Sequence, residues 1–193
     1  MRMKDDGGLR AIARYLHELG GLKRVRRSGW WLAGVRDPES VAEHSFRAAA
    51  VAYFLAGLEG ADRGRAVAMA LFHDGAEARV NDPHRMLKRY VDWTGVEEKV
   101  LGDQLRGLPA KATGGLEGLL AEARAKETLE ARVAKDADRI ECLLQAREYG
   151  EQGHKVEEWI ESSVDELSTE SAKRLAKAIL ASPPDDWRAA SEP

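Results

Sequence analysis

The sequence lacks several features that would place it in a particular class of protein. It contains one cysteine, Cys142, among 193 residues, which excludes an internal disulfide and a zinc site built from several cysteines. No apolar run approaches the ~20 residues that a membrane-spanning helix needs. Alternating strand patterns rich in β-branched residues are also missing. We therefore expect a globular chain that is neither membrane-spanning nor disulfide-stabilised.

The chain has no excess of basic charge. Its formal net charge is −3, so composition gives no reason to expect a nucleic-acid polymer or an anionic membrane surface as a partner. The N-terminal segment MRMKDDGGLRAIARYLHEL has acidic residues where a signal peptide would carry an apolar stretch. We expect a cytoplasmic location.

The residues that are abundant favour helices. Hydrophobic residues make up 44% and charged residues 33% of the chain, a balance typical of a soluble globular protein. Ala, Leu, Glu, Arg and Lys are strong helix formers, so the predicted fold class is all-α. We see no internal repeat and no linker. We expect one domain over residues 1–182 and a mobile tail over residues 183–193, after Pro183 and Pro184.

Start and stop signals divide the chain into helices. Ser40 and Glu43 form a capping-box pattern that opens a helix running to about Leu58. Asp62 can cap the next helix, which we expect to continue to about Ala78. Other helices are expected at about 9–19, 83–90, 115–125, 127–149, 154–167 and 169–181, with broken helical pieces over 92–118. The helices at 115–125 and 127–149 could be continuous.

Residues of the kind that bind metals occur at three places in apolar helical patterns: His44, the adjacent His73 and Asp74, and Asp138. Each has a structural alternative, because a lone histidine on an apolar face is often a hydrogen-bonded core residue. Asp138 could also pair with Lys135 or Arg139. An ionised carboxylate in an apolar helix is nevertheless costly unless it is paired or bound to a metal.

The order of these residues favours a metal site. Four N and O ligands from three helices suit one divalent ion such as Co, Mn, Fe, Mg or Zn. Two imidazoles favour a transition metal over calcium.

The chain resembles the HD-domain metal-dependent phosphohydrolases, whose signature is H…HD…D, and most closely their 5′-deoxynucleotidase branch. The matching stretches are LKRVRRSGWWLAGVRDPESVAEHSFRAA, ALFHDGAEARVNDP and VAKDADRIECLLQAREY, so the likeness covers roughly residues 20–150. It implies an HD-domain helical bundle with a central metal site. The implied ligands are His44, His73, Asp74 and Asp138, with Asp136 as the alternative to Asp138.

The resemblance also places an acidic residue at Glu77, four positions after His73 and three after Asp74. On a helix this spacing predicts one shared face, from which Glu77 could orient or deprotonate an attacking water. We therefore place Glu77 and Asp74 as catalytic residues. The structural alternative for Glu77 is an exposed carboxylate paired with Arg79.

A basic connector precedes the first histidine. Residues 22–36 hold five Lys or Arg residues and no acidic residue. Most could be solvated surface residues, but arginine can hold a phosphate through two parallel hydrogen bonds. The resemblance makes Arg27 the expected phosphate-binding residue.

Three further residues have two readings each. Trp30 or Trp31 could stack on a base or lie against the sugar, as an aromatic residue does in the related deoxynucleotidases, and Trp30 is our expected substrate contact. Both tryptophans could equally be core anchors of the loop. Asp82 could accept a hydrogen bond from a deoxyribose hydroxyl, or it could cap a helix that starts at Pro83.

Taken together, the motifs predict an enzyme that hydrolyses deoxyribonucleoside 5′-monophosphates with one divalent metal ion. Another nucleotide phosphodiesterase or triphosphohydrolase of the HD type is the first alternative. A non-catalytic metal-binding or nucleotide-binding module is the second. The partner is expected to be a small nucleotide, and the resemblance also allows a homodimer.

Overall fold

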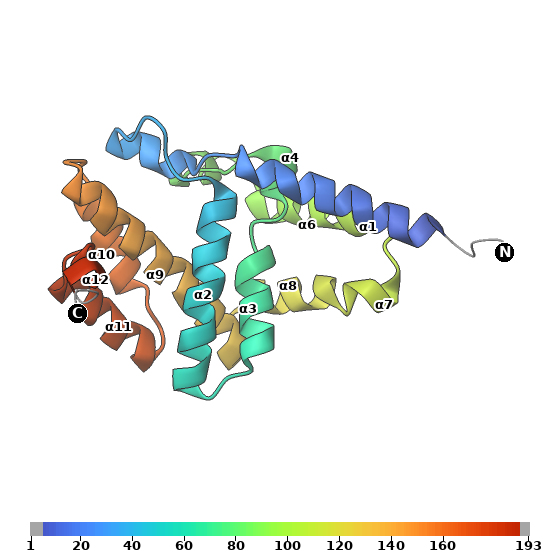
Figure 1. The fold of residues 1–193 in the computed structure, drawn as a ribbon. Coiled ribbons are helices and arrows are strands. Elements are labelled where there is room, and N and C mark those ends of the chain that lie inside the picture. The colour runs from blue at the N-terminus through green and yellow to red at the C-terminus, as the bar shows by residue number, and fades with distance from the viewer. Residues whose placement is uncertain (1–5, 190–193) are drawn as a thin grey trace.

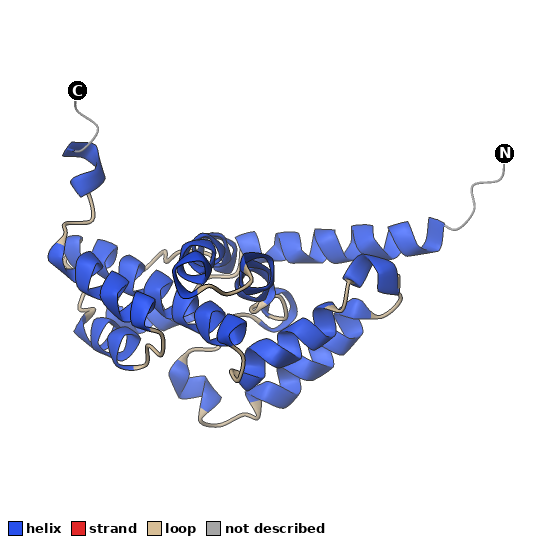
Figure 2. Ribbon diagram, turned by 90° about the horizontal axis from the view of Figure 1, so that it is seen from below, coloured by secondary structure: helices blue, strands red, loops and turns tan. Residues whose placement is uncertain are grey.

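The computed structural model describes residues 6–189, which form helices and connecting loops (Figures 1 and 2). The helices are α1 (Asp6–Leu19), the 3₁₀ helices η1 (Gly20–Lys23) and η2 (Ser28–Ala33), α2 (Val41–Glu59), α3 (Arg63–Phe72), α4 (Glu77–Val80), α5 (Arg85–Lys88), α6 (Trp93–Leu105), α7 (Ala110–Thr113), α8 (Leu116–Ala125), α9 (Leu129–Glu151), α10 (Glu157–Asp165), α11 (Glu170–Ala181) and α12 (Asp186–Ala189). The described residues contain no strand, and one isolated bridge joins Arg26 to Ser40. The all-α prediction is confirmed.

Three helices form the centre of the molecule. In Figure 1, α2 and α3 lie side by side, and α9 crosses them diagonally. Their facing sides bury Leu55, Met69, Ile140 and Leu143 almost completely, and this removal of apolar surface from water is the main favourable term in folding. Helices α8, α10 and α11 pack on the outside of α9. The three predicted ligand-bearing segments therefore belong to one core.

Local cap chemistry explains where the central helices begin. The Ser40 hydroxyl accepts a hydrogen bond from the Glu43 amide, and the Glu43 carboxylate accepts one from the Ser40 amide, so the predicted capping box is present. Asp62 caps α3 as predicted, by accepting from the Arg65 amide. Thr128 caps α9 in the same way through the Ala131 amide. These caps satisfy amides that have no partner within the helix.

The prediction of one helix from Asp62 to Ala78 is wrong, because α3 ends at Phe72. After Phe72 the backbone bonds change from the i−4 to the i−3 pattern: the amides of Gly75, Glu77 and Arg79 each donate to the carbonyl three residues earlier. This tighter turning, typical of 3₁₀ structure, separates α3 from the short α4. His73 and Asp74 therefore lie in a turn at the end of α3.

The region between α4 and α9 also differs from the expected pattern. Helix α5 begins after His84, whose ring accepts from the Leu87 amide, so neither Asp82 nor Pro83 starts it. Residues 92–118, expected as broken pieces, contain the 13-residue helix α6. Helices α8 and α9 are separate, because Lys126 adopts φ +58° between them. Two of these boundaries coincide with local features, the His84 cap and the positive φ of Lys126, that the sequence signals did not reveal.

The ends of the chain bear on two expectations. Helix α1 begins at Asp6, three residues earlier than predicted. Within the predicted tail, residues 186–189 form the one-turn helix α12, and residues 190–193 lie outside the described residues. In residues 6–189, no helix combines the length and apolarity that crossing a bilayer requires. The single-domain boundary at residue 182 stays a prediction.

Candidate metal centre

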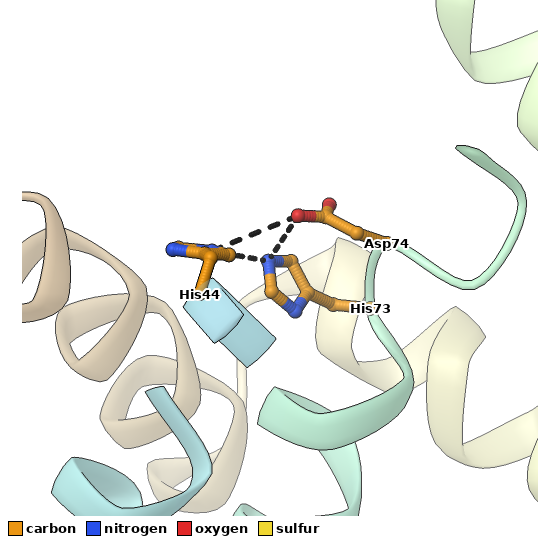
Figure 3. Close-up of side chains that lie close together, drawn as sticks. All are labelled: His44, His73 and Asp74. Atoms are coloured by element: carbon orange, nitrogen blue, oxygen red, sulfur yellow. Dashed lines mark hydrogen bonds and ion pairs between the residues drawn. The ribbon is translucent and has the colours of Figure 1, made fainter. Parts of the chain in front are cut away.

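Side chains from the three central helices meet at one end of the core. His44 comes from the first turns of α2, His73 and Asp74 from the turn after α3, and Asp138 from the middle of α9. Figure 3 shows His44, His73 and Asp74 pointing toward one another. His44 is completely buried, whereas the other three side chains keep a small exposed fraction. The site is thus closed on the core side and open on one other side.

The acceptor atoms converge on a small volume. His44 Nε2 lies 3.4 Å from His73 Nε2. One carboxylate oxygen of Asp74 lies 3.0 Å from His73 Nε2 and 3.6 Å from His44 Nε2. One oxygen of Asp138 lies 3.3 and 3.8 Å from the same two nitrogens. His44, His73 and Asp74 form a group whose ligand atoms could hold one metal ion.

Hydrogen bonds fix which nitrogen of each histidine faces this volume. His73 Nδ1 lies 2.8 Å from the Ala70 carbonyl oxygen, which can only accept, so Nδ1 carries the proton. His44 Nδ1 contacts the Glu141 carboxylate. Burial raises the pKa of Glu141, but His44 and Arg47 together lower it by more, so the pKa lies below its usual value. The carboxylate is therefore ionised and, like the Ala70 carbonyl, can only accept a hydrogen bond. With a metal bound, both Nε2 atoms would direct their lone pairs into the site, the usual arrangement for metal-binding histidines.

The charges around the site require a cation. Burial raises the pKa of Asp74, but His73 and Arg27 lower it below its usual value. Burial likewise raises the pKa of Asp138, and Lys135 and His44 lower it well below its usual value. Burial and Arg27 lower the pKa of His44, but the nearby carboxylates raise it to about 10. In the metal-free chain a second proton on His44 balances these carboxylates, and the converging nitrogen and carboxylate donors fit a divalent ion in its place.

The structure separates the two aspartates of α9. Asp138 faces the histidines with one oxygen and pairs with Lys135 through the other, at 2.6 Å. Asp136 points away, where it accepts hydrogen bonds from the amides and hydroxyls of Ser168 and Thr169. Asp136, the alternative ligand, is therefore placed outside the site and fastens the start of α11.

Arg27 lies at the edge of the metal centre as the resemblance implies. Its guanidinium is 3.4 Å from an Asp74 oxygen and 3.5 Å from an Asp82 oxygen. Burial lowers the pKa of Arg27, but Asp82 and Asp74 raise it well above its usual value. The other Asp82 oxygen accepts from the Ser28 amide at 2.7 Å and from its hydroxyl at 2.9 Å. Asp82 thus fastens the Arg27 loop; the prediction that it caps a helix is wrong, and the sugar contact stays a prediction.

Glu77 is a buried carboxylate without a partner for one of its oxygens. The residue is 2% exposed, and Oε2 has no hydrogen-bond partner among the described residues. Burial, Asp74 and Asp82 raise the pKa of Glu77 well above its usual value. The alternative that Glu77 is exposed and paired with Arg79 is wrong, because Arg79 pairs with Glu18. Although α3 does not continue, the i−3 pattern keeps Asp74 and Glu77 on one side of the turn.

The two adjacent tryptophans differ in environment. Trp30 is 2% exposed; its ring stacks on Trp159 at 5.7 Å between centroids, and its indole N–H donates to Glu39. Trp31 is 54% exposed. Trp30 therefore anchors the loop, whereas Trp31 does not, so the alternative that both are core anchors holds for Trp30 alone. Trp30 also lines a large cavity beside the metal centre. Its contact with substrate stays a prediction, and only the ring atoms that reach this cavity could make it.

A cavity of about 1280 Å³ opens from the metal centre. His73, Asp74 and Asp138 line one end of it, together with Arg27 and Glu77. Other walls come from α5, α6, the end of α8 and the C-terminal helix α10. Helix α10 contributes Trp159, Ser162 and Ser163, although no chemical motif could be recognised in that third of the chain. A large cleft of mixed polar and apolar lining beside ligand-type residues is the expected form of a small-molecule site.

The sequence interpretation missed the residues that support His44. Glu141 is fully buried and holds His44 Nδ1, while Arg47 contacts Glu141 at 2.8 and 2.9 Å. Burial and Glu141 raise the pKa of the nearby Glu39 to about 7, against the smaller opposite effect of His44. One signal was available, because Glu141 lies three positions after Asp138 on α9 and therefore on the same helix face.

Comparison with known proteins identifies the fold family. Residues 19–180 match the HD domain family. The chain belongs to the HD domain family. This HD domain is 33% identical over 155 residues to human 5′-deoxynucleotidase HDDC2, an alignment that covers 77% of the chain and 72% of that relative. The family resemblance predicted from the three motifs is confirmed.

Solved structures agree with the family assignment. The HD domain matches a conserved hypothetical protein from Pyrococcus furiosus with a TM-score of 0.74 and 28% identity, over 88% of this chain and 99% of the other. It also matches a structure described as a predicted metal-dependent phosphohydrolase from Magnetospirillum magnetotacticum, with a TM-score of 0.71 and 26% identity, over 94% and 95% of the two chains. The similarity extends over nearly the whole described chain.

Proposed function

We propose that this HD domain is a metal-dependent 5′-deoxynucleotidase, which hydrolyses a deoxyribonucleoside 5′-monophosphate to a deoxynucleoside and inorganic phosphate. The observation that best supports this proposal is the convergence of two histidine Nε2 atoms and two ionised carboxylates beside a large cavity. The curated relatives from human, Dictyostelium discoideum and Schizosaccharomyces pombe are named 5′-deoxynucleotidases, which supports the choice of substrate.

The proposed metal ligands are His44, His73, Asp74 and Asp138. Two nitrogens and two carboxylate oxygens suit one divalent Co, Mn, Fe, Mg or Zn ion. A bound divalent ion would supply polarisation of the phosphate and a lower pKa for the attacking water. Asp74 has a second role in the proposal, because its contact with Arg27 links the metal site to the phosphate-binding residue.

Glu77 is the proposed general base. Its free Oε2 is buried at the edge of the cavity, where it can orient a water molecule and take its proton. A carboxylate whose pKa is raised above its usual value is a stronger base than an exposed glutamate. General-base catalysis is most efficient when the pKa of the base lies near the working pH. The water oxygen then forms the new bond to phosphorus as the bond to the 5′ oxygen breaks. The 5′ oxygen takes a proton from solvent and leaves as the deoxynucleoside hydroxyl, and Glu77 releases the proton that it took from the water.

Arg27 is the proposed phosphate-binding residue, and Asp82 and Trp30 are the proposed contacts to the sugar. Arg27 is already oriented by Asp74 and Asp82, so little side-chain freedom is lost when a phosphate binds. Asp82 accepts from Ser28 through one oxygen and keeps the other near Arg27. A deoxyribose hydroxyl would approach this second oxygen.

Three further expectations accompany the function. The proposed partner is a small nucleotide, and we expect binding to neither a nucleic-acid polymer nor a membrane. We also propose a cytoplasmic location and a homodimer, both carried over from the sequence as predictions. Cell fractionation tests the location, and the mass measured by light scattering tests the homodimer.

Phosphate release from a panel of nucleotides tests the function. The purified protein is stripped of metal, supplied with Co, Mn, Mg or Zn, and given dAMP, AMP or dATP. The proposal predicts metal-dependent release from dAMP that exceeds release from AMP and dATP. Hydrolysis of dATP alone would instead favour a triphosphohydrolase, and dAMP binding without turnover would favour a binding module.

A further inference from the structure

We propose that Lys126, with Lys135 and Arg139, forms a phosphate-binding subsite on the wall of the cavity beside Asp138. The ligand is a phosphoryl group of a nucleotide, and the proposal rests on the proposed function for the identity of that nucleotide. Lys126 is proposed as a substrate-binding residue, and the sequence predicted a substrate contact for none of the three.

The three cations lie at the metal end of the cavity. All three line it together with His73 and Asp138. Lys135 Nζ is 2.6 Å from the outer oxygen of Asp138, and Arg139 follows Asp138 directly on α9. Lys126 comes from the turn between α8 and α9 and is close enough to interact electrostatically with Asp138, Lys135 and Arg139.

The ion pairs around this wall leave positive charge in excess. Lys135 shares Asp138 with the proposed metal. Arg139 pairs with Glu166, and Arg85 pairs with both Glu166 at 3.3 Å and Glu158 at 3.8 Å. These two arginines are therefore balanced by two carboxylates, and Lys126 remains the cation of this wall without a paired carboxylate in the described part of the chain. No hydrogen bond or ion pair holds the Lys126 ammonium among residues 6–189. An anion bound between these side chains would balance the excess.

Arg139 offers a second, independent sign of an absent partner. Its Nε atom is buried and has no hydrogen-bond partner among the described residues. Buried donors are nearly always satisfied, because an unmade hydrogen bond costs the full loss of hydration. Because Nε is closed to solvent, a phosphate could reach only the part of Arg139 that lines the cavity, where guanidinium and phosphate geometries match.

The backbone at Lys126 is unusual for a lysine. Lys126 ends α8 with φ +58°, and its amide donates to the Glu122 carbonyl at 3.2 Å. Glycine is the common residue at such a position because a side chain is strained there. Burial, Lys135 and Arg139 lower the pKa of Lys126, against the smaller opposite effect of Asp138. A lysine kept in a strained conformation and near like charges points to a role for its charge.

Two phosphoryl groups could occupy the subsite. One is the 5′-phosphate that is cleaved, which would then lie between Arg27 and Lys126. The other is a second phosphate, as in a nucleoside diphosphate. Both share the chemistry of a phosphate oxygen held by an ammonium and a guanidinium.

Ligand binding to matched lysine variants tests the subsite. The variants are Lys126→Gly, which removes the charge and relieves the strained backbone, Lys126→Arg, which keeps the charge, and Lys155→Gly, which removes another lysine of the same cavity. Calorimetry measures binding of inorganic phosphate, dAMP and dADP to the metal-loaded protein, and thermal unfolding measures stability. We expect Lys126→Gly to bind about tenfold more weakly with an unchanged or higher melting temperature, Lys126→Arg to recover binding, and Lys155→Gly to match the wild type.

The pattern across ligands identifies the phosphate that occupies the subsite. Weaker binding of inorganic phosphate and dAMP assigns the subsite to the cleaved phosphate, with a higher KM for dAMP. Weaker binding of dADP alone assigns it to a second phosphate. Unchanged binding of all three ligands to Lys126→Gly, or no phosphate binding by the wild type, would overturn the proposal. If the wild type does not hydrolyse dAMP but its phosphate binding depends on Lys126, the proposed function fails and the subsite stands.

Discussion

The two histidines of the metal centre are held in one orientation by different partners. The Ala70 carbonyl holds His73, and the buried Glu141 carboxylate holds His44. A backbone carbonyl cannot be removed by substitution, whereas Glu141 can be changed. The contribution of the supporting residues to metal affinity can therefore be measured at His44.

Glu141→Gln should weaken metal binding while the fold is retained. Glutamine keeps a hydrogen-bond acceptor for His44 Nδ1 but removes the negative charge that makes the ring a stronger ligand, an effect of about tenfold or more in affinity. Competition with a metal chelator measures it. Glu148→Gln is the control, because Glu148 also pairs with Arg47 but does not contact His44. Equal affinities of the two variants would contradict this role of Glu141.

Glu77 should make the stability of the metal-free protein depend on pH. Burial and the neighbouring aspartates raise its folded pKa well above the ordinary value near 4.5, so the folded chain binds this proton more tightly than the unfolded chain. The resulting stabilisation is fully present below the unfolded pKa and is lost as the pH rises through the folded pKa. Urea unfolding of metal-free Glu77→Gln should therefore show a gain over the wild type that grows with pH. A gain that shrinks with pH would contradict the raised pKa.

At the scale of elements, α9 has separate binding and structural roles on its two sides. One side carries Asp138, Glu141 and Cys142 toward the metal centre and the cavity. The other carries Asp136, which accepts hydrogen bonds from the backbone at residues 168 and 169. Positions 136 and 138 are about 200° apart around a helix, so a single helix serves both purposes.

Asp136→Ala should destabilise the fold without removing the metal. The substitution leaves two amides and two hydroxyls without their charged acceptor, at a cost of about 3 kcal/mol. Urea unfolding measures the loss, and metal content is measured in parallel. Asp138→Ala is the matched comparison and should lose the metal instead. A variant of Asp136 that unfolds normally but lacks metal would reverse the two assignments.

Helices that begin with a local capping residue could be predicted from the sequence. Ser40, Glu43 and Asp62 act on amides within three residues, so their pattern is visible locally. The end of α3 could not be read in the same way, because His73 and Asp74 sit in a turn that only its hydrogen-bond pattern reveals. The link from Ser28 to Asp82 joins residues 54 apart and has no local signal. Asp138 was preferred to Asp136 because of the resemblance and helical geometry together.

At the scale of the whole molecule, α2 presents an apolar surface on the side away from the core. Phe46, Phe54 and Leu58 are 74, 67 and 70% exposed, and their spacing places them within a broad stripe of about 120° around the helix. Exposed apolar patches commonly mark interaction surfaces. If the chain forms the predicted homodimer, this stripe is the surface we expect a second copy to cover.

Light scattering on Phe46→Glu/Phe54→Glu tests that expectation. The wild type should have the mass of a dimer and the double variant that of a monomer, since burying two carboxylates in an apolar contact is costly. Circular dichroism confirms that the helices are retained. A monomeric wild type would refute the homodimer.

The measurement that tests the central claim most directly is metal content and dAMP hydrolysis in the same preparations. Wild-type, His73→Ala and Asp138→Ala proteins are stripped of metal, reloaded with Co, Mn, Mg or Zn, and assayed for bound ion and released phosphate. The account predicts one ion per wild-type chain, phosphate release only in its presence, and loss of both in each variant. Phosphate release by the metal-free wild type, or full metal binding by both variants, would contradict it.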